Sequence, residues 1–167
     1  MKFCDFILPD SIIPELDATT KEGVIREMVK GLTEKGGVPE EDYEGVVAAI
    51  LRREELGSTG IRLHIAVPHT KHIGVERLAG TVALSSAGVD FESLDGEKVN
   101  LFFLLVSPPD RPGEHLRALE HITRQLQKES FGESLRAVSD IVEKSGVDAA
   151  REAINKILAA ADDACNA

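Results

Sequence analysis

The spacing of apolar and polar residues predicts two amphipathic helices in the first third of the chain. Residues 19–37 carry an apolar residue at every third or fourth position, and Thr19 and Glu22 have the spacing of an N-terminal capping box. Residues 38–57 repeat this period after Pro39, a residue that suits the first turn of a helix. We expect each helix to bury its apolar stripe and to leave its charged face in solvent.

The patterns typical of strands lie in the middle of the chain. Short apolar runs predict strands at residues 65–67 and at about residues 80–85, and a third strand is expected at about residues 99–106. The stretch LFFLLV within this third strand is apolar without alternation. Both faces of the strand should therefore be buried, which places it in the middle of a sheet.

A helix with a buried histidine is predicted soon after the third strand, over residues 113–127. Its apolar stripe has a 4-3-4 spacing and consists of His115, Leu119, Ile122 and Leu126. His115 therefore begins the core-facing stripe. His121 points away from His115 and is expected in solvent.

The rest of the chain is predicted to add two helices. A short one is expected over residues 130–138, where Ser130 and Glu133 have capping-box spacing, and a final one over about residues 148–161. Helical and extended segments alternate without a repeat, a linker or a low-complexity tract. We therefore expect residues 1–167 to form a single α/β domain with helices covering a sheet.

The composition is that of a globular protein without a broad nucleic-acid-binding face. The chain is 43% hydrophobic and 29% charged. Its formal net charge of -10 opposes binding to a phosphate backbone, so no nucleic-acid partner is expected.

The cysteines and the N-terminal residues indicate a cytoplasmic protein. Cys4 and Cys165 stand near opposite ends of the chain and are expected as reduced thiols, since a secreted disulfide framework has more cysteines at closer spacing. Asp5 and Pro9 interrupt the apolar residues at the start, so no signal-peptide core forms. The longest apolar run is far shorter than the ~20 residues of a membrane helix, and we expect no membrane insertion.

One histidine lies where functional residues are common. His69 follows Pro68 at the end of the predicted strand 65–67, where the chain leaves the sheet. A neutral imidazole nitrogen is a nucleophile near neutral pH and can carry a phosphoryl group. The alternative is an ordinary capped surface histidine at the end of a strand, and its position alone leaves both open.

A metal site is a further interpretation of the same region. His64, His69 and His72 have the spacing H-x4-H-x2-H, and zinc needs three or four converging ligands. On a strand, His64 and His69 point to opposite faces, because their separation is odd. No cysteine or carboxylate stands at a familiar ligand spacing, so we expect no metal.

One interpretation of the residues directly upstream is an anion pocket. Arg53 ends the second predicted helix, and Ser58, Thr59 and the backbone amides of Gly57 and Gly60 follow it. The alternative, which the spacing alone favours, is an exposed cation that complements the dipole at the end of the helix.

His115 is the third candidate site residue. It begins a helix, where unpaired N–H groups and the helix dipole favour an anion. The alternative is a hydrogen-bonded histidine of the core.

The stretch LRREELGSTGIRLHIAVPH, residues 51–69, resembles the active-site signature of the enzyme IIA domain of the bacterial phosphoenolpyruvate-dependent phosphotransferase system, of the fructose/mannitol/nitrogen-regulatory type. The R-E, S-T-G-I and A-V-P-H blocks follow one another in the family's order. The stretch HLRALEHITRQL, residues 115–126, is similar to the helix that carries the family's second histidine. The likeness covers about residues 7–138.

This resemblance implies a three-layer α/β/α sandwich with a mixed central sheet. It also implies that His69 accepts a phosphoryl group from a histidine phosphocarrier protein and passes it to an enzyme IIB partner, or acts in nitrogen-type regulation. Arg53 and His115 would stabilise the transferred group, and residues 58–60 would shape the phosphate-binding wall of the pocket. Such chemistry needs positioning and charge stabilisation rather than a cofactor.

The chain departs from the family pattern at one place. Where the family has two glycines separated by one residue, this chain has Arg62-Leu63-His64. Glycines let the backbone turn tightly or approach a partner closely, so the loop and the docking of partners are expected to differ here. An alternative function is therefore a non-catalytic protein-binding regulatory module on the same fold.

Overall fold

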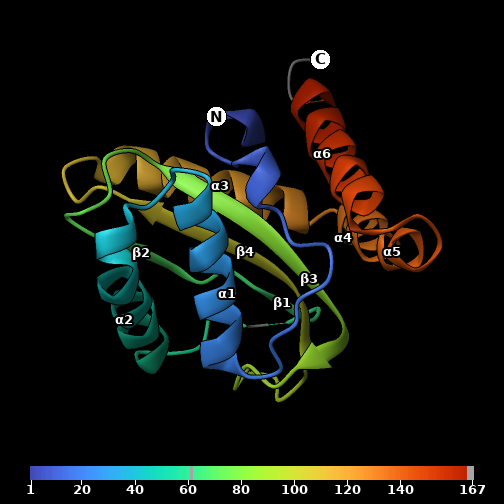
Figure 1. The fold of residues 1–167 in the computed structure, drawn as a ribbon, viewed down its shortest axis with the longest axis horizontal. Coiled ribbons are helices and arrows are strands. Elements are labelled where there is room, and N and C mark those ends of the chain that lie inside the picture. Colours follow the sequence, from blue (N-terminus) through green and yellow to red (C-terminus); the bar gives the residue numbers. More distant parts are fainter. Residues whose placement is uncertain (61, 165–167) are drawn as a thin grey trace.

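A mixed β-sheet organises the chain, which is seen in a computed structural model that describes residues 1–60 and 62–164 (Figure 1). Its strands are β1 (Ile65–Ala66), β2 (His69–Lys71), β3 (Ala79–Val89) and β4 (Val99–Ser107). β4 pairs in parallel with β1 and with β2, and antiparallel with β3. Ile61 of the S-T-G-I block and Cys165 lie outside the described residues.

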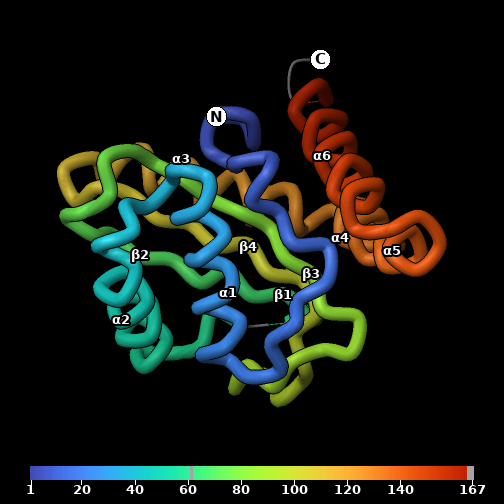
Figure 2. The backbone as a smooth tube through the Cα atoms, in the orientation of Figure 1, coloured from blue at the N-terminus to red at the C-terminus, as the bar shows by residue number. Residues whose placement is uncertain are grey.

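The N-terminal segment extends this sheet beyond β3. Isolated parallel bridges join Ile7 to Gly80 and Ile13 to Ala83, and Figure 2 shows this segment running beside β3. It contains two short 3-10 helices, η1 (Phe3–Asp5) and η2 (Pro9–Ser11).

The side chains of β4 alternate between two separate cores. One face contributes Phe102, Leu104 and Val106 to the first cluster, and the other contributes Leu101, Phe103 and Leu105 to the second. All six are fully buried. The prediction of a central strand that is buried on both faces is confirmed.

Two helical layers cover the two faces of the sheet (Figure 1). The first cluster is closed by α1 (Lys21–Glu34) and α2 (Tyr43–Glu55), the latter preceded by the 3-10 helix η3 (Glu40–Asp42). The second cluster is closed by helices after β4, which are α3 (Pro112–Leu126), α4 (Glu129–Arg136) and α6 (Val147–Ala164). This confirms the predicted α/β/α sandwich with a mixed sheet. The short helix α5 (Ser139–Ser145), which joins α4 to α6, was not predicted.

The helix starts differ from the predicted capping boxes. The N-cap of α1 is Thr20 rather than Thr19, and its Oγ1 accepts a hydrogen bond from the amide of Gly23 at 3.1 Å. α4 begins one residue before Ser130, so no capping box with Glu133 forms, and the side chain of the N-cap Lys128 makes no capping hydrogen bond. A shift of one residue at a helix start is below what sequence spacing resolves.

The predicted strand at residues 65–67 is interrupted at Pro68. β1 ends at Ala66 and the chain resumes as β2 at His69, so His69 begins a second strand segment instead of leaving the sheet. The carbonyl of Pro68 still accepts from the amide of Leu105 at 3.0 Å, which keeps both segments along the same edge of β4.

The prediction of a solvent-exposed His121 is wrong, since this side chain is only 2% exposed. The ring of Phe3 in η1 lies 4.5 Å from the His121 ring, edge to face, and Asp162 of α6 lies 3.7 Å from His121 Nε2. Residues near the two ends of the chain therefore cover the face of α3 that carries His121, a face that the apolar stripe of this helix does not include. Burial lowers the pKa of His121, which favours the neutral ring.

Asp162 joins the two ends of the chain. Its carboxylate accepts hydrogen bonds from the backbone amides of Phe3 at 2.7 Å and Cys4 at 3.0 Å. The Cys4 thiol itself is free and exposed. None of the described helices combines the length and the hydropathy that crossing a membrane requires.

Replacing Asp162 with alanine should destabilise the fold, because it leaves two backbone amides without their acceptor. We expect Asp162→Ala to lower the free energy of unfolding by about 1–3 kcal/mol, measured by urea denaturation. Asp163→Ala is the matched control, since Asp163 is exposed, and it should change stability by less than about 0.5 kcal/mol. Equal midpoints for the two variants would contradict this role of Asp162.

Candidate functional site

His69 presents one defined nitrogen for chemistry. It lies opposite Leu105 at the start of β2, and its Nδ1 is 2.7 Å from the carbonyl oxygen of Val67. A carbonyl can only accept, so Nδ1 carries the proton and donates it. In the neutral ring Nε2 then holds the lone pair, and within the described residues it has no hydrogen-bond partner. His69 is thus oriented as a nucleophile through Nε2.

His115 faces the same site from the first turn of α3. It is only 6% exposed, and its Nδ1 lies 2.6 Å from Oγ of Ser107, the last residue of β4. The centroids of the His69 and His115 rings are 5.6 Å apart, with an angle of 57° between the planes. The fold therefore brings together two histidines that the sequence proposed separately.

Both imidazoles are held in the neutral state. Burial is the main cause that lowers the pKa of His69, and the positive charge of Arg53 lowers it further. Burial, followed by the charges of His69 and Lys71, lowers the pKa of His115 to about 4. Near neutral pH, Nε2 of His69 is therefore free to accept an electrophile.

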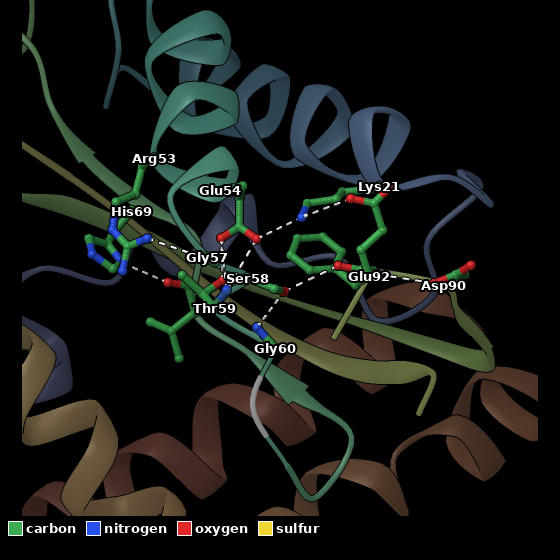
Figure 3. Close-up of polar contacts among 12 residues, drawn as sticks. Lys21, Arg53, Glu54, Gly57, Ser58, Thr59, Gly60, His69, Asp90 and Glu92 are labelled. Carbon is green, nitrogen blue, oxygen red and sulfur yellow. Dashed lines mark hydrogen bonds and ion pairs between the residues drawn. The ribbon is translucent and has the colours of Figure 1, made fainter. Parts of the chain in front are cut away.

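Arg53 lies beside His69 at the end of α2 (Figure 3). Its Nη1 donates to the carbonyl of Gly57 at 3.1 Å. Gly57 has a φ of 147°, a conformation that side chains rarely adopt, so glycine is required for this carbonyl to face Arg53. Among the described residues Arg53 has no other hydrogen-bond partner, which leaves its remaining N–H groups available to an anion.

The predicted pocket wall at residues 58–60 is held by internal hydrogen bonds. Oγ of Ser58 donates to the carbonyl of Phe91 at 3.2 Å and accepts from the amide of Gly60 at 3.0 Å. Thr59 donates to the carboxylate of Glu54 from its amide at 3.2 Å and from its Oγ1 at 2.5 Å. The assignment of these residues to phosphate binding stays a prediction, and their contacts shape the loop next to Arg53.

Glu54 belongs to this site, although its sequence position was not interpreted as part of it. Glu54 is buried, and besides Thr59 it contacts Lys21 at 3.0 Å between Oε1 and Nζ (Figure 3). Its position could have indicated this, since it lies four residues after Ile50 on the buried stripe of α2. A carboxylate on a buried stripe requires partners.

The histidines of the metal interpretation do not converge. Nδ1 of His64 donates to the carbonyl of Lys98 at 2.8 Å, and Nδ1 of His72 accepts from the amide of Gly74 at 3.0 Å. In the part of the chain that the structure describes, no three histidine, cysteine or acidic side chains are placed to hold a metal ion. Lys71 is exposed, and His72 is half-buried.

The loop that replaces the family glycines adopts a left-handed backbone. Leu63 and His64 have φ values of 60° and 61°, a region that costs a residue other than glycine about 1–2 kcal/mol. Arg136 of α4 holds the loop, because Nη2 donates to the carbonyl of Leu63 and Nε donates to Oδ1 of Asn100 at 3.0 Å. The side chain of Leu63 remains 53% exposed.

Known proteins resemble the chain over most of its length. The family profile described as phosphoenolpyruvate-dependent sugar phosphotransferase system, EIIA 2, matches residues 5–143. A nitrogen regulatory protein of Bradyrhizobium diazoefficiens is 34% identical over 140 residues, which are 84% of this chain and 90% of that protein. The fructose-specific EIIABC component of Bacillus subtilis is 34% identical over 148 residues, 85% of this chain but only 23% of that longer protein.

Solved structures agree with these matches. The nitrogen regulatory protein IIA-Ntr from Neisseria meningitidis has a TM-score of 0.71 at 28% identity, and the match covers 79% of this chain and 88% of that one. The Escherichia coli enzyme IIAMtl, solved in complex with phosphorylated enzyme IIBMtl, has a TM-score of 0.63 at 26% identity, covering 80% of this chain and 92% of that one.

The lowered pKa values predict a specific titration order. In an NMR titration of the histidine rings, His115 should titrate near about 4, and His69 below the ordinary value of ~6.5. The unfolded chain binds these protons more tightly, so folding stability should be full above pH ~6.5 and decline as the pH falls towards 4. A His115 midpoint at or above the ordinary value would contradict the buried, neutral ring.

The role of Arg136 can be tested by limited proteolysis with trypsin, which cleaves after arginine and lysine. Arg136→Ala removes the clamp on the carbonyl of Leu63, so cleavage of the Arg62–Leu63 bond should become about tenfold faster. Mass spectrometry of the fragments measures this cleavage. Arg117→Ala, at an exposed position of α3, should leave the rate unchanged. Equal cleavage in both variants would show that the loop is held by other contacts.

Proposed function

This chain belongs to the phosphoenolpyruvate-dependent sugar phosphotransferase system, EIIA 2, family, and from that premise we propose that His69 is the histidine that carries the phosphoryl group. The general function is that of a phosphocarrier or a regulator in this system. The observation that carries the proposal is the hydrogen bond from His69 Nδ1 to Val67, which leaves Nε2 as the free nucleophilic nitrogen.

The transfer step follows from this geometry. The lone pair of His69 Nε2 attacks the phosphorus of a phosphohistidine on the donor protein. As the new N–P bond forms, the old N–P bond breaks, and its electron pair returns to the donor imidazole. Such a step needs alignment and stabilisation of charge on the phosphoryl oxygens more than it needs a strong acid or base.

Arg53 and His115 supply that stabilisation. The unpaired N–H groups of Arg53 donate to the phosphoryl oxygens while Gly57 holds the guanidinium in place. We assign Nδ1 of the neutral His115 ring as the acceptor of a hydrogen bond from the Ser107 hydroxyl, and this tautomer puts the proton on Nε2. That N–H is the second donor to the phosphoryl group. Together these roles make the chain a phosphotransferase component with a phosphohistidine intermediate.

The partners are other proteins of the system. We take the donor to be a histidine phosphocarrier protein and the acceptor to be an enzyme IIB protein or a regulatory target, all in the cytoplasm. The solved complex of enzyme IIAMtl with phosphorylated enzyme IIBMtl supports an acceptor of the IIB type, and the nitrogen regulatory relatives support a regulatory target. α3, α4 and α6 share one core, which supports treating residues 1–167 as one functional domain.

Phosphorylation in a reconstituted system tests the role of His69. After incubation with phosphoenolpyruvate, enzyme I and the histidine phosphocarrier protein, intact-mass measurement should show one acid-labile phosphoryl group on the wild type and none on His69→Ala. Arg53→Gln should slow the transfer by about 10²-fold, because one donor to the developing charge is lost. His72→Ala is the control at a nearby ring and should be phosphorylated normally.

The same assay separates the proposal from its rival, a non-catalytic binding module whose altered 62–64 loop recognises a partner. In this rival, phosphorylation is lost or incidental, and His69→Ala leaves partner binding unchanged. A wild type that gains no phosphoryl group, or a His69→Ala variant that gains it equally well, would refute the proposed role of His69.

A further inference from the structure

An ion pair between half-buried Lys21 and buried Glu54 connects the start of α1 to the phosphoryl site. Lys21, the first residue of α1, places Nζ 3.0 Å from Oε1 of Glu54, and their side chains are 15% and 2% exposed. Lys21 also lies over the ring of Phe91 at 4.8 Å, and the carbonyl of Phe91 accepts from Ser58. Glu92 is a weaker partner of Lys21, since it lies 3.8 Å away and is largely exposed. Lys21 therefore contacts the groups that hold the loop at residues 57–60 from the side opposite Arg53 (Figure 3).

The negative charge of Glu54 has two opposing effects: it strengthens the bonds to Thr59, and it opposes the binding of a phosphoryl group. Its carboxylate holds Thr59 through both the amide and the hydroxyl, which fixes the loop whose Gly57 carbonyl orients Arg53. A carboxylate accepts such bonds better than a neutral group does. However, a buried negative charge beside Arg53 and His69 repels an incoming phosphoryl group and competes for the guanidinium, unless a cation neutralises it.

We propose that Lys21 is a positioning residue for phosphoryl transfer: by neutralising Glu54, it lets Glu54 hold Thr59 while Arg53 stays open to the phosphoryl group. This inference rests on the proposed function of His69 and adds to it a residue of α1, an element that contributes no group to the transfer itself.

The charges around His69 make the proposal measurable. Burial lowers the pKa of His69 and the hydrogen bond to the Val67 carbonyl raises it. Among the charged groups, Arg53 and Lys71 lower this pKa and Glu54 raises it, and the ring of His115 also faces His69. Loss of Lys21 exposes His69 to the full charge of Glu54 and should raise its pKa. Loss of the Glu54 charge should lower it. A purely structural role gives no reason for these opposite signs.

Four variants test the proposal through two readouts, the rate of phosphorylation by the carrier protein and the NMR titration of His69. Lys21→Met should slow phosphorylation about tenfold, which is a smaller loss than the ~10²-fold caused by displacing a reacting group by about 1 Å. It should also raise the pKa of His69. Glu54→Gln should lower that pKa. Lys21→Arg should behave like the wild type. The double variant Lys21→Met with Glu54→Gln should recover most of the rate, because the uncompensated charge is gone while the amide oxygen still accepts from Thr59.

Lys30→Met is the matched control, since Lys30 is an exposed lysine of the same helix, and it should change neither readout. The proposal is overturned if folded Lys21→Met titrates and transfers like the wild type, or if the double variant is no faster than Lys21→Met. If Lys21→Met does not fold, Glu54→Gln decides, and an unchanged His69 titration there counts against the proposal. A wild type that takes no phosphoryl group would instead refute the role of His69, and the titration would still report on Lys21.

Discussion

The burial of β4 on both faces is the constraint on which the rest of the structure depends. Its side chains alternate between two cores, so a helical layer must close each face of the sheet. The same strand sets the site, because His69 pairs opposite Leu105 and Ser107 at the strand end holds His115. The separation of the two imidazoles is therefore fixed by the strand and not by flexible loops, which suits a transfer that depends on alignment.

Much of the fold could be predicted because its information is local. The run LFFLLV indicates a central strand by itself, and the stripes of α1, α2 and α3 follow helical periods. The burial of His121 could not be predicted, because it depends on Phe3 and Asp162, which the fold brings from the two ends of the chain. The break at Pro68 was also missed, since one residue without an amide proton can interrupt a strand while its carbonyl stays in the ladder.

Part of the site could likewise be predicted from the sequence, and part could not. The sequence and its family resemblance pointed to His69, Arg53 and His115, and the structure brings these three side chains together. The sequence could not indicate which nitrogen of His69 is free, because the carbonyl of Val67 decides that. The contact between Lys21 and Glu54 could not be predicted either, because it forms between two helices. Leu63 and His64 keep a strained backbone because Arg136 holds the loop, so this departure from the family pattern has a defined structure.

We propose that the backbone carbonyl of Val67 selects Nε2 of His69 as the phosphoryl acceptor. The most direct test is NMR of ¹⁵N-histidine-labelled protein after phosphorylation, in which coupling between ³¹P and ¹⁵N identifies the bonded nitrogen. The expected result is coupling to Nε2 of His69, while Nδ1 keeps its proton towards Val67. A phosphoryl group on Nδ1 of His69, or on another histidine, would contradict it.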